Sequence, residues 1–473
     1  MRFYLYLLGA LLLLGEPGVS AQTSDERYRL PLSEVLQVFE EQYERRISVS
    51  GQLIKDLELD YALWRFRPDP ELTLRNILGP FDLVFEEQTD SSYRIVPFAY
   101  HKRQPSEGAD LLVHLAAQYR NREEWEARKE RLRPCLLKAL DSEVWPSWDA
   151  PSAVVSHPRT YQDYSVENLA LETFPGVFVF GTIYKPVGTQ GKVPVIVSPN
   201  GHFSQGRYNK DVQARCAMMA RMGAIVMNYD LFAWGESALQ FESSSHRSSL
   251  AMVMQTINGF RVLDYLLSLE QADPDRVGIT GGSGGGSQTM LLAALDERYS
   301  LSVPAVMLSS YFSGGCPCES GRPIHLCGGG SSNVELSASF APKPQLIISD
   351  GGDWTRHVPE MEFPFVQGVY AFYNASGNLD NAHFPDEGHN YGASKRYALY
   401  DFLHEHFQLK SFRKADGSWD ERGFVVESEK DMQVFGGSED LLPEHALRSF
   451  AALESLWNRL LLDANSKIIK NEE

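Results

Sequence analysis

Residues 276–294 read RVGITGGSGGGSQTMLLAA, and this stretch decides the fold. Residues 276–280 have the length and apolar composition of a short buried strand, and residues 286–296 have those of a helix. Between them, Gly281 to Gly285 fit the pattern G-x-S-x-G around Ser283. In that pattern the chain turns sharply from strand to helix, and a Cβ two residues to either side of the serine would clash. The stretch therefore predicts that Ser283 is a nucleophile held on a strained turn.

Two other interpretations of this glycine-rich run are weaker. GGSGGGS has the composition of a flexible linker, but a linker would not stand between an apolar strand and a helix. A phosphate-binding loop needs a lysine after its glycines, or a final glycine at the position that Ser287 occupies. Neither requirement is met.

Strand-like and helical stretches alternate on both sides of the turn. Runs such as VPVIVS, AIVMNY and PQLIIS are continuously apolar, as strands buried on both faces are. The pattern predicts an α/β domain over residues 151–473, with a mainly parallel sheet and helices on both faces. The expected strands are 177–184, 193–198, 224–229, 276–280, 304–309 and 344–349, and the main expected helices are 207–222, 249–269, 286–296 and 395–407.

A serine nucleophile needs a base and an acid that orients the base. In α/β-hydrolases they follow the serine in the order acid, then histidine. Asp353 follows a glycine turn just after the strand PQLIIS and is the expected acid, with Asp350 as the alternative. His389 lies in a glycine-flanked loop before the last helix of the alternating pattern and is the expected base. His383 is its rival, but the preceding short strand is a less suitable place for a base.

An oxyanion hole needs two backbone donors. The N–H of Gly284, next to the nucleophile, is one. The strand VPVIVS runs into Pro199-Asn200-Gly201-His202-Phe203, and in this fold the second donor comes from the turn after that strand. We therefore expect the N–H of His202 to be the second donor.

Six segments between residues 199 and 392 carry a family resemblance: PNGHF, YDLFAWGES, GITGGSGGGSQT, SGGCPCESG, SDGGDWT and EGHNYG. Together they resemble bacterial α/β-hydrolases known as acetylxylan esterases or carbohydrate esterases, related to dienelactone hydrolases. The α/β-hydrolase pectin methylesterases lie near this group. The resemblance spans about residues 150–410. It implies a serine carboxylester hydrolase that needs no cofactor and removes acetyl or methyl esters from plant cell-wall polysaccharide.

The same resemblance assigns smaller roles. Asp230 and Gly235 match the superfamily stretch D-x-x-G-x-G-x-S, and Asp230 is expected to brace its loop rather than to catalyse. The sequence departs from many relatives at Asn200, where they have His, and at Asn390, where Asp often follows the base. Neither departure falls on the expected catalytic triad.

The loop after residue 309 is rich in cysteine. Cys316, Cys318 and Cys327 lie in it, with Glu319 and His325 nearby, a composition that can hold zinc. In an oxidising compartment thiols more often pair, and we expect a Cys318–Cys327 disulfide. We expect no metal here. The chain has five cysteines, so at least one thiol stays free.

The sequence of the first 150 residues indicates three further segments of the chain. Residues 1–21 have a positive start, an apolar run at 3–15 and a Val-Ser-Ala cleavage site, as an export signal has. Residues 22–100 predict a small α+β domain, whose order and final hairpin FDLVFEEQTDSSYRIV resemble the STN module at the N-termini of secretins and TonB-dependent receptors. Residues 101–150 predict a helical connector that packs on the following domain. The mature protein is expected to be periplasmic or secreted, without a transmembrane segment.

Charge excludes several classes of partner. The 473 residues include 62 acidic and 44 basic ones, for a net charge of -18, and no basic cluster stands out. Nucleic acids and anionic membranes are therefore not expected partners. An ester-bearing carbohydrate is the expected substrate, and the N-terminal domain is where a protein partner would dock. The competing hypothesis is a non-catalytic docking protein that acts through that domain.

Overall fold

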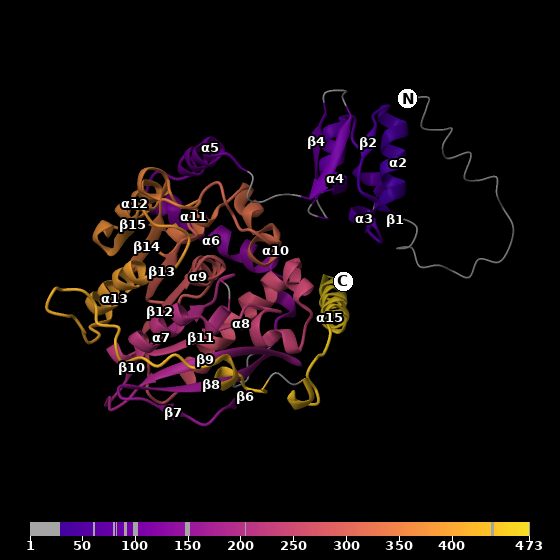
Figure 1. Ribbon diagram of the computed structural model, residues 1–473. Coiled ribbons are helices and arrows are strands. Elements are labelled where there is room, and N and C mark those ends of the chain that lie inside the picture. Colours follow the sequence, from indigo (N-terminus) through magenta and orange to yellow (C-terminus); the bar gives the residue numbers. More distant parts are fainter. Residues whose placement is uncertain are drawn as a thin grey trace. The chain divides into compact units, whose positions relative to one another are not determined.

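The computed structural model describes residues 29–59, 62–78, 81, 83–88, 92–97, 103–146, 152–203, 205–436 and 439–472. The chain forms two compact units, residues 1–99 and residues 100–473 (Figure 1). The expected export signal lies outside the described residues. None of the described helices combines the length and the apolar composition that a membrane crossing requires.

The first unit is a small α+β domain. Its strands β2 (Ile47–Ser48), β4 (Leu83–Glu87) and β5 (Tyr93–Pro97) form one sheet in the order β2-β5-β4, and β1 (Leu30–Pro31) pairs with β3 (Glu58–Leu59). The helices are α2 (Leu32–Tyr43), α3 (Gly51–Ile54) and α4 (Pro70–Leu78). The α+β character and the closing hairpin were expected from the sequence, and Phe39, Leu74 and Ile95 meet in the core of this domain. The STN resemblance stays a prediction.

The second unit has the α/β-hydrolase fold. Its described strands form one sheet in the order β15-β14-β13-β12-β10-β11-β9-β8-β6, with β7 beside β8. The run from β11 to β15 is parallel and the remaining pairs are antiparallel. The strands are β6 (Ala153–Val155), β7 (Arg159–Thr160), β8 (Tyr164–Phe174), β9 (Val177–Pro186), β10 (Val193–Pro199), β11 (Ile225–Tyr229), β12 (Ala272–Gly282), β13 (Leu301–Ala305), β14 (Gln345–Asp350) and β15 (Leu379–Phe384).

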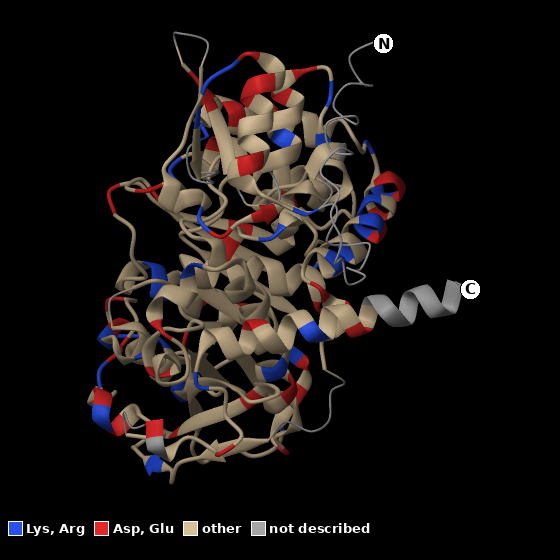
Figure 2. Cartoon of the chain, turned by 90° about the vertical axis from the view of Figure 1, so that its right-hand side faces the viewer, with Lys and Arg blue, Asp and Glu red and all other residues tan. Residues whose placement is uncertain are grey.

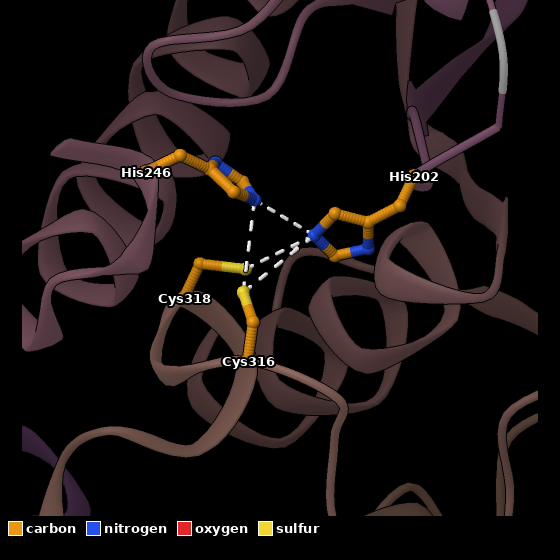
Figure 3. A group of neighbouring side chains, drawn as sticks. All are labelled: His202, His246, Cys316 and Cys318. Carbon is orange, nitrogen blue, oxygen red and sulfur yellow. Dashed lines mark hydrogen bonds between the residues drawn. The ribbon is translucent and has the colours of Figure 1, made fainter. Parts of the chain in front are cut away.

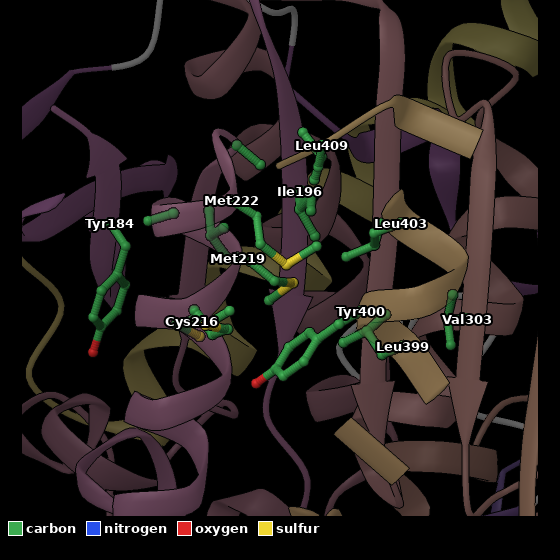
Figure 4. Packing of buried hydrophobic residues seen from close by; sticks show 14 of the residues in the cluster. Tyr184, Ile196, Cys216, Met219, Met222, Val303, Leu399, Tyr400, Leu403 and Leu409 are labelled. Atoms are coloured by element: carbon green, nitrogen blue, oxygen red, sulfur yellow. The ribbon is translucent and has the colours of Figure 1, made fainter. Parts of the chain in front are cut away.

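Helices cover both faces of this sheet because its central strands alternate their side chains between two apolar layers. On β10, Ile196 points to the layer of α7 (Lys210–Met222) and α13 (Ala393–Phe407), where methionines and leucines interlock (Figure 4). Val195 and Val197 point to the opposite layer, with α8 (Ser249–Ser268) and α9 (Gly284–Leu295). This period of two is why the strands read as unbroken apolar runs.

One predicted strand is displaced. Residues 304–309 were expected to be a strand, but β13 ends at Ala305. Val306 follows with φ of 47°, a left-handed backbone that a β-branched residue rarely adopts and that a strand cannot contain. The apolar residues after it, Met307 and Leu308, are buried as part of a loop.

The connector is part of the second unit. Its helices are α5 (Pro105–Ala116) and α6 (Arg122–Ala139), in the region where a helical connector was expected. Arg128 on α6 makes a buried, bidentate ion pair with Glu335 of α11 (Asn333–Ala338), with both N–O distances at 2.9 Å. Cys135 on the same helix forms a disulfide with Cys327. The expected Cys318–Cys327 pairing is therefore wrong, because the partner of Cys327 comes from a helix 192 residues earlier.

Further helices of the second unit are the short α10 (Pro317–Ser320), α12 (Phe363–Ala371) and α14 (Glu429–Met432), and the long C-terminal α15 (Phe450–Glu472). Trp457 of α15 packs against Phe174 and donates a hydrogen bond to Asp141 at 3.1 Å, which ties the C-terminus to the connector. In the cartoon of Figure 2, basic and acidic residues are interspersed along the described parts of the chain.

Candidate active site

The serine turn has the strained geometry that its glycines predict. Ser283 stands between β12 and α9 with φ of 56° and ψ of −122°, which is unusual for a residue with a side chain. A Cβ at Gly285 would lie 2.3 Å from the carbonyl oxygen of Pro199, so no other residue fits there without a backbone shift. The N–H of Ser283 donates to Ala305 at 3.0 Å. The turn is thus held from both neighbouring strands, β10 and β13.

The loop after β10 lies directly against this turn. A Cβ at Gly201 would come within 2.2 Å of the carbonyl oxygen of Gly282 and 3.1 Å of the Ser283 Cβ. A Cβ at Gly284 would come within 2.8 Å of the His202 ring. The two expected oxyanion donors, the N–H groups of His202 and Gly284, therefore belong to segments in close contact beside Ser283. The N–H of Gly284 opens α9, where the first amides of a helix have no intrahelical acceptor.

Asp353 and His389 form a tight pair. The Nδ1 atom of His389 lies 2.6 Å from Oδ2 of Asp353. The other carboxylate oxygen accepts from the backbone N–H and the hydroxyl of Thr355, both at 2.6 Å. Asp353 is almost fully buried, whereas the imidazole is 29% exposed. Because the carboxylate accepts at Nδ1, the imidazole keeps Nε2 available toward a substrate.

The alternative acid, Asp350, is engaged elsewhere. It lies at the end of β14 and makes a buried ion pair with Lys395 on α13, at 2.7 Å. Its second oxygen accepts from the N–H of Gly352 at 3.0 Å. The rival base, His383, lies on β15 and contacts Ser349 Oγ at 2.9 Å, so it joins neither Asp353 nor Ser283.

Aromatic side chains connect the pair to the serine turn. The Phe203 ring lies 5.7 Å from the His389 ring, and the Phe203 side chain would be 3.2 Å from a Cβ at Gly282. Trp354 lies on His389 from another side at 4.5 Å. These contacts bring the predicted nucleophile, the base and the oxyanion loop to one place at the carboxyl ends of β10, β12 and β14, where this fold class places its ligands.

Asp230 has the bracing position that its motif predicts. It is buried after β11, and its Oδ2 accepts from Arg207 Nε and from the N–H of Glu236, both at 3.0 Å. Burial raises the pKa of Asp230, and the Arg207 guanidinium opposes that shift. Gly235, with φ of 59°, leaves room for the carboxylate, because a Cβ there would lie 2.6 Å from it.

The cysteine loop approaches the site through Glu319. This buried carboxylate accepts from Ser287 Oγ at 3.3 Å and lies 3.9 Å from Nδ1 of His202. Burial raises the pKa of Glu319. His325, which the sequence placed near the cysteines, is half-buried and is not part of the described cluster of ligand atoms. Desolvation of its ring lowers its pKa to about 4.

Comparison with solved structures identifies the family. Methylesterase BT1017 is 41% identical to this chain, with a TM-score of 0.73, over 95% of this chain and 100% of its own. The chain belongs to the same family as this methylesterase. No protein-family model and no curated protein matches the chain.

Two more distant structures are also esterases by name. An acetyl xylan esterase from Paenibacillus sp. R4 is 16% identical over 58% of this chain and 94% of its own, with a TM-score of 0.42. A glucuronoyl esterase from Teredinibacter turnerae is 15% identical over 71% of this chain and 98% of its own, with a TM-score of 0.47.

Proposed function

We propose that this protein is an exported serine esterase that hydrolyses methyl esters on carbohydrate. The observation that carries the proposal is the Asp353–His389 pair beside the strained Ser283, in a chain that shares a family with a protein named methylesterase. A methyl ester on a sugar requires a carboxyl group on that sugar. The substrate class is therefore an esterified uronic acid within a polysaccharide or oligosaccharide, of which methylated pectin is the representative to test.

The proposed reaction gives each of these groups one role. Ser283 Oγ attacks the ester carbonyl while His389 Nε2 takes its proton, and Asp353 holds the resulting imidazolium. The N–H groups of Gly284 and His202 donate to the oxyanion of the tetrahedral intermediate. His389 then gives the proton to the departing methoxide, so that methanol leaves and an acyl-enzyme remains. Water, deprotonated by His389, then attacks the acyl carbonyl, the bond to Ser283 Oγ breaks, and His389 returns its proton to Ser283 as the acid leaves.

The competing hypothesis of a docking protein without activity gains no support from this site. A scaffold that had lost its chemistry would not need to keep a buried carboxylate with three donors, a histidine on that carboxylate and a left-handed serine. A protein partner of the N-terminal unit remains a separate prediction, which does not conflict with catalysis.

The test measures both alcohol and acid release. The purified chain is incubated with methylated pectin and, separately, with acetylated xylan, and methanol and acetate are quantified. We expect methanol from pectin, and none from the Ser283→Ala variant. Acetate release without methanol would move the substrate to acetyl esters. Loss of neither product in Ser283→Ala would overturn the serine mechanism.

A further inference from the structure

Next to the oxyanion loop lies a cluster of soft ligand atoms that the proposed chemistry does not use. It consists of His202, His246, Cys316 and Cys318, and one ligand atom from each lies within 4.8 Å of the others. Figure 3 shows the two imidazoles and the two thiols pointing toward a common centre. The four residues come from three separate segments: the loop after β10, the short 3-10 helix at Ser243–Arg247, and α10 with its preceding residue.

The distances match the ligand shell of a tetrahedral ion. His202 Nε2 is 2.7 Å from His246 Nε2 and 3.2 Å from Cys318 Sγ. Cys316 Sγ is 3.7 Å from each of the two Nε2 atoms. Zinc bonds of about 2.0 Å to nitrogen and about 2.3 Å to sulfur place tetrahedral ligands about 3.3 to 3.8 Å apart. The cluster needs only small side-chain shifts, mainly a separation of the two imidazoles, to reach that spacing.

The surroundings of the histidines prepare them as ligands. His246 Nδ1 lies 2.7 Å from the carbonyl oxygen of Phe232, which can only accept, so Nδ1 carries the proton and the Nε2 lone pair points into the cluster. His202 Nδ1 faces the Glu319 carboxylate at 3.9 Å. Metal-binding histidines usually have such an acceptor on the second nitrogen, which fixes the tautomer and strengthens the ligand.

We propose that His202, His246, Cys316 and Cys318 bind one zinc ion, which fastens the oxyanion loop to α10 and to the 243–247 turn. Two thiolates and two neutral imidazoles balance the charge of Zn²⁺, so a buried centre of zero net charge results. Binding releases the two thiol protons to solvent, and no redox step occurs. Four protein ligands leave no open position, so the ion is structural and His202 is a positioning residue through its side chain.

This inference replaces the expectation that the cysteine loop holds no metal. The sequence suggested zinc with Glu319 and His325, but the structure recruits the histidines from residues 202 and 246 instead. The presence of the ion does not depend on the proposed function. Its effect on catalysis does, because it acts through the N–H of His202.

The first experiment measures the metal in the full chain, purified without chelator or added metal. Inductively coupled plasma mass spectrometry should find about one zinc per chain. Cys318→Ser and His246→Gln should lose that zinc. Cys216→Ala is the matched control, because Cys216 is a free, fully buried cysteine on α7 outside the cluster, and it should keep the zinc.

The second experiment is spectroscopic, and its main measurement uses the wild-type chain. Chelated protein reloaded with Co²⁺ should show thiolate-to-cobalt charge transfer in the near ultraviolet and the intense visible bands of a tetrahedral site. Both signals should be absent in Cys318→Ser. X-ray absorption on the zinc form should give a shell of two nitrogens and two sulfurs.

The third readout separates positioning from simple stability. Removal of the ion should lower kcat by about 10-fold to 100-fold with little change in KM, because a displaced donor weakens binding of the oxyanion and not of the ground state. Restoring Zn²⁺ to the chelated wild-type chain should recover kcat.

The proposal is overturned if the chain as purified contains no zinc and takes up no Co²⁺ under reducing conditions. It is also overturned if peptide mass mapping finds a Cys316–Cys318 disulfide in the active protein. A chain that binds zinc in a Cys2His2 shell but releases no methanol would keep the metal site and contradict only the proposed function.

Discussion

Two constellations of polar side chains lie side by side in this protein, and they are built in opposite ways. The serine turn is local: five consecutive residues, Gly281 to Gly285, carry its geometry, and the strand and helix on either side follow in sequence. The His/Cys cluster is assembled from residues up to 116 positions apart, as from His202 to Cys318. The first can be read from sequence because backbone strain demands particular residues at particular places. The second exists only once three loops have converged.

The largest expected effect concerns the local constellation. Ser283→Ala should lower kcat on a methyl ester by about 10⁶-fold, since the group that forms the acyl-enzyme is gone. Binding of product and thermal melting should not change. A folded variant that loses less than about tenfold would show that the turn is not the nucleophile.

The next prediction distinguishes two aspartates three residues apart. Asp353→Asn should lower kcat by about 10⁴-fold through the wrong imidazole tautomer, with little change in stability. Asp350→Asn is the matched variant, and it should lower the free energy of unfolding by about 3 kcal/mol, because the buried Lys395 loses the carboxylate at 2.7 Å and keeps only that of Glu387 at 3.6 Å. Kinetics and chemical denaturation of both variants decide the matter. A worse kinetic defect in Asp350→Asn would exchange their roles.

Cys135→Ala tests the Cys135–Cys327 disulfide, which links the cysteine loop to α6. Opening the Cys135–Cys327 disulfide removes a constraint across 192 residues and should lower the free energy of unfolding by about 3 kcal/mol. Because Arg128 still binds Glu335, the zinc content of the folded protein should not change. Loss of zinc in a folded Cys135→Ala chain would mean that the disulfide, not the four ligands alone, shapes the cluster.

The smallest effect is expected from removing the N-terminal unit. A chain that begins at residue 103 keeps α5 and α6 and should hydrolyse a small methyl ester within a few-fold of the full chain. Both constellations lie wholly in the second unit. Unchanged melting together with lost activity would instead place part of residues 29–97 in the active site.

These regions also mark how far the sequence carries a prediction. The α/β-hydrolase fold and the serine turn could be predicted beforehand, since strand pattern and glycine spacing are local signals. Chain order made Asp353 the expected acid, and its carboxylate lies on His389 in the structure, while its catalytic role stays a prediction. The ion pair of Asp350 with Lys395 could not be predicted, because no sequence signal near either residue points to the other. The same holds for Cys327, whose neighbours suggested Cys318 although α6 supplies Cys135. The prediction of where β13 ends was wrong for a third reason. Met307 and Leu308 have the apolar character of strand residues, but the backbone has already left the extended conformation at Val306.

The disulfide also has a consequence for the order of events in a cell. In the proposed export, the cysteines would enter the oxidising compartment in chain order, at 135, 216, 316, 318 and 327, and the disulfide joins the first to the last. An oxidase that coupled thiols as they emerged would join Cys135 to Cys216. The native Cys135–Cys327 disulfide therefore requires either disulfide isomerisation or oxidation that is delayed until Cys327 has emerged. Three thiols, those of Cys216, Cys316 and Cys318, compete with Cys327 for Cys135. A zinc ion bound to Cys316 and Cys318 would protect two of them from oxidation before Cys327 emerges. Metal supply during export would then govern the yield of correctly crosslinked protein, quite apart from its rate of turnover.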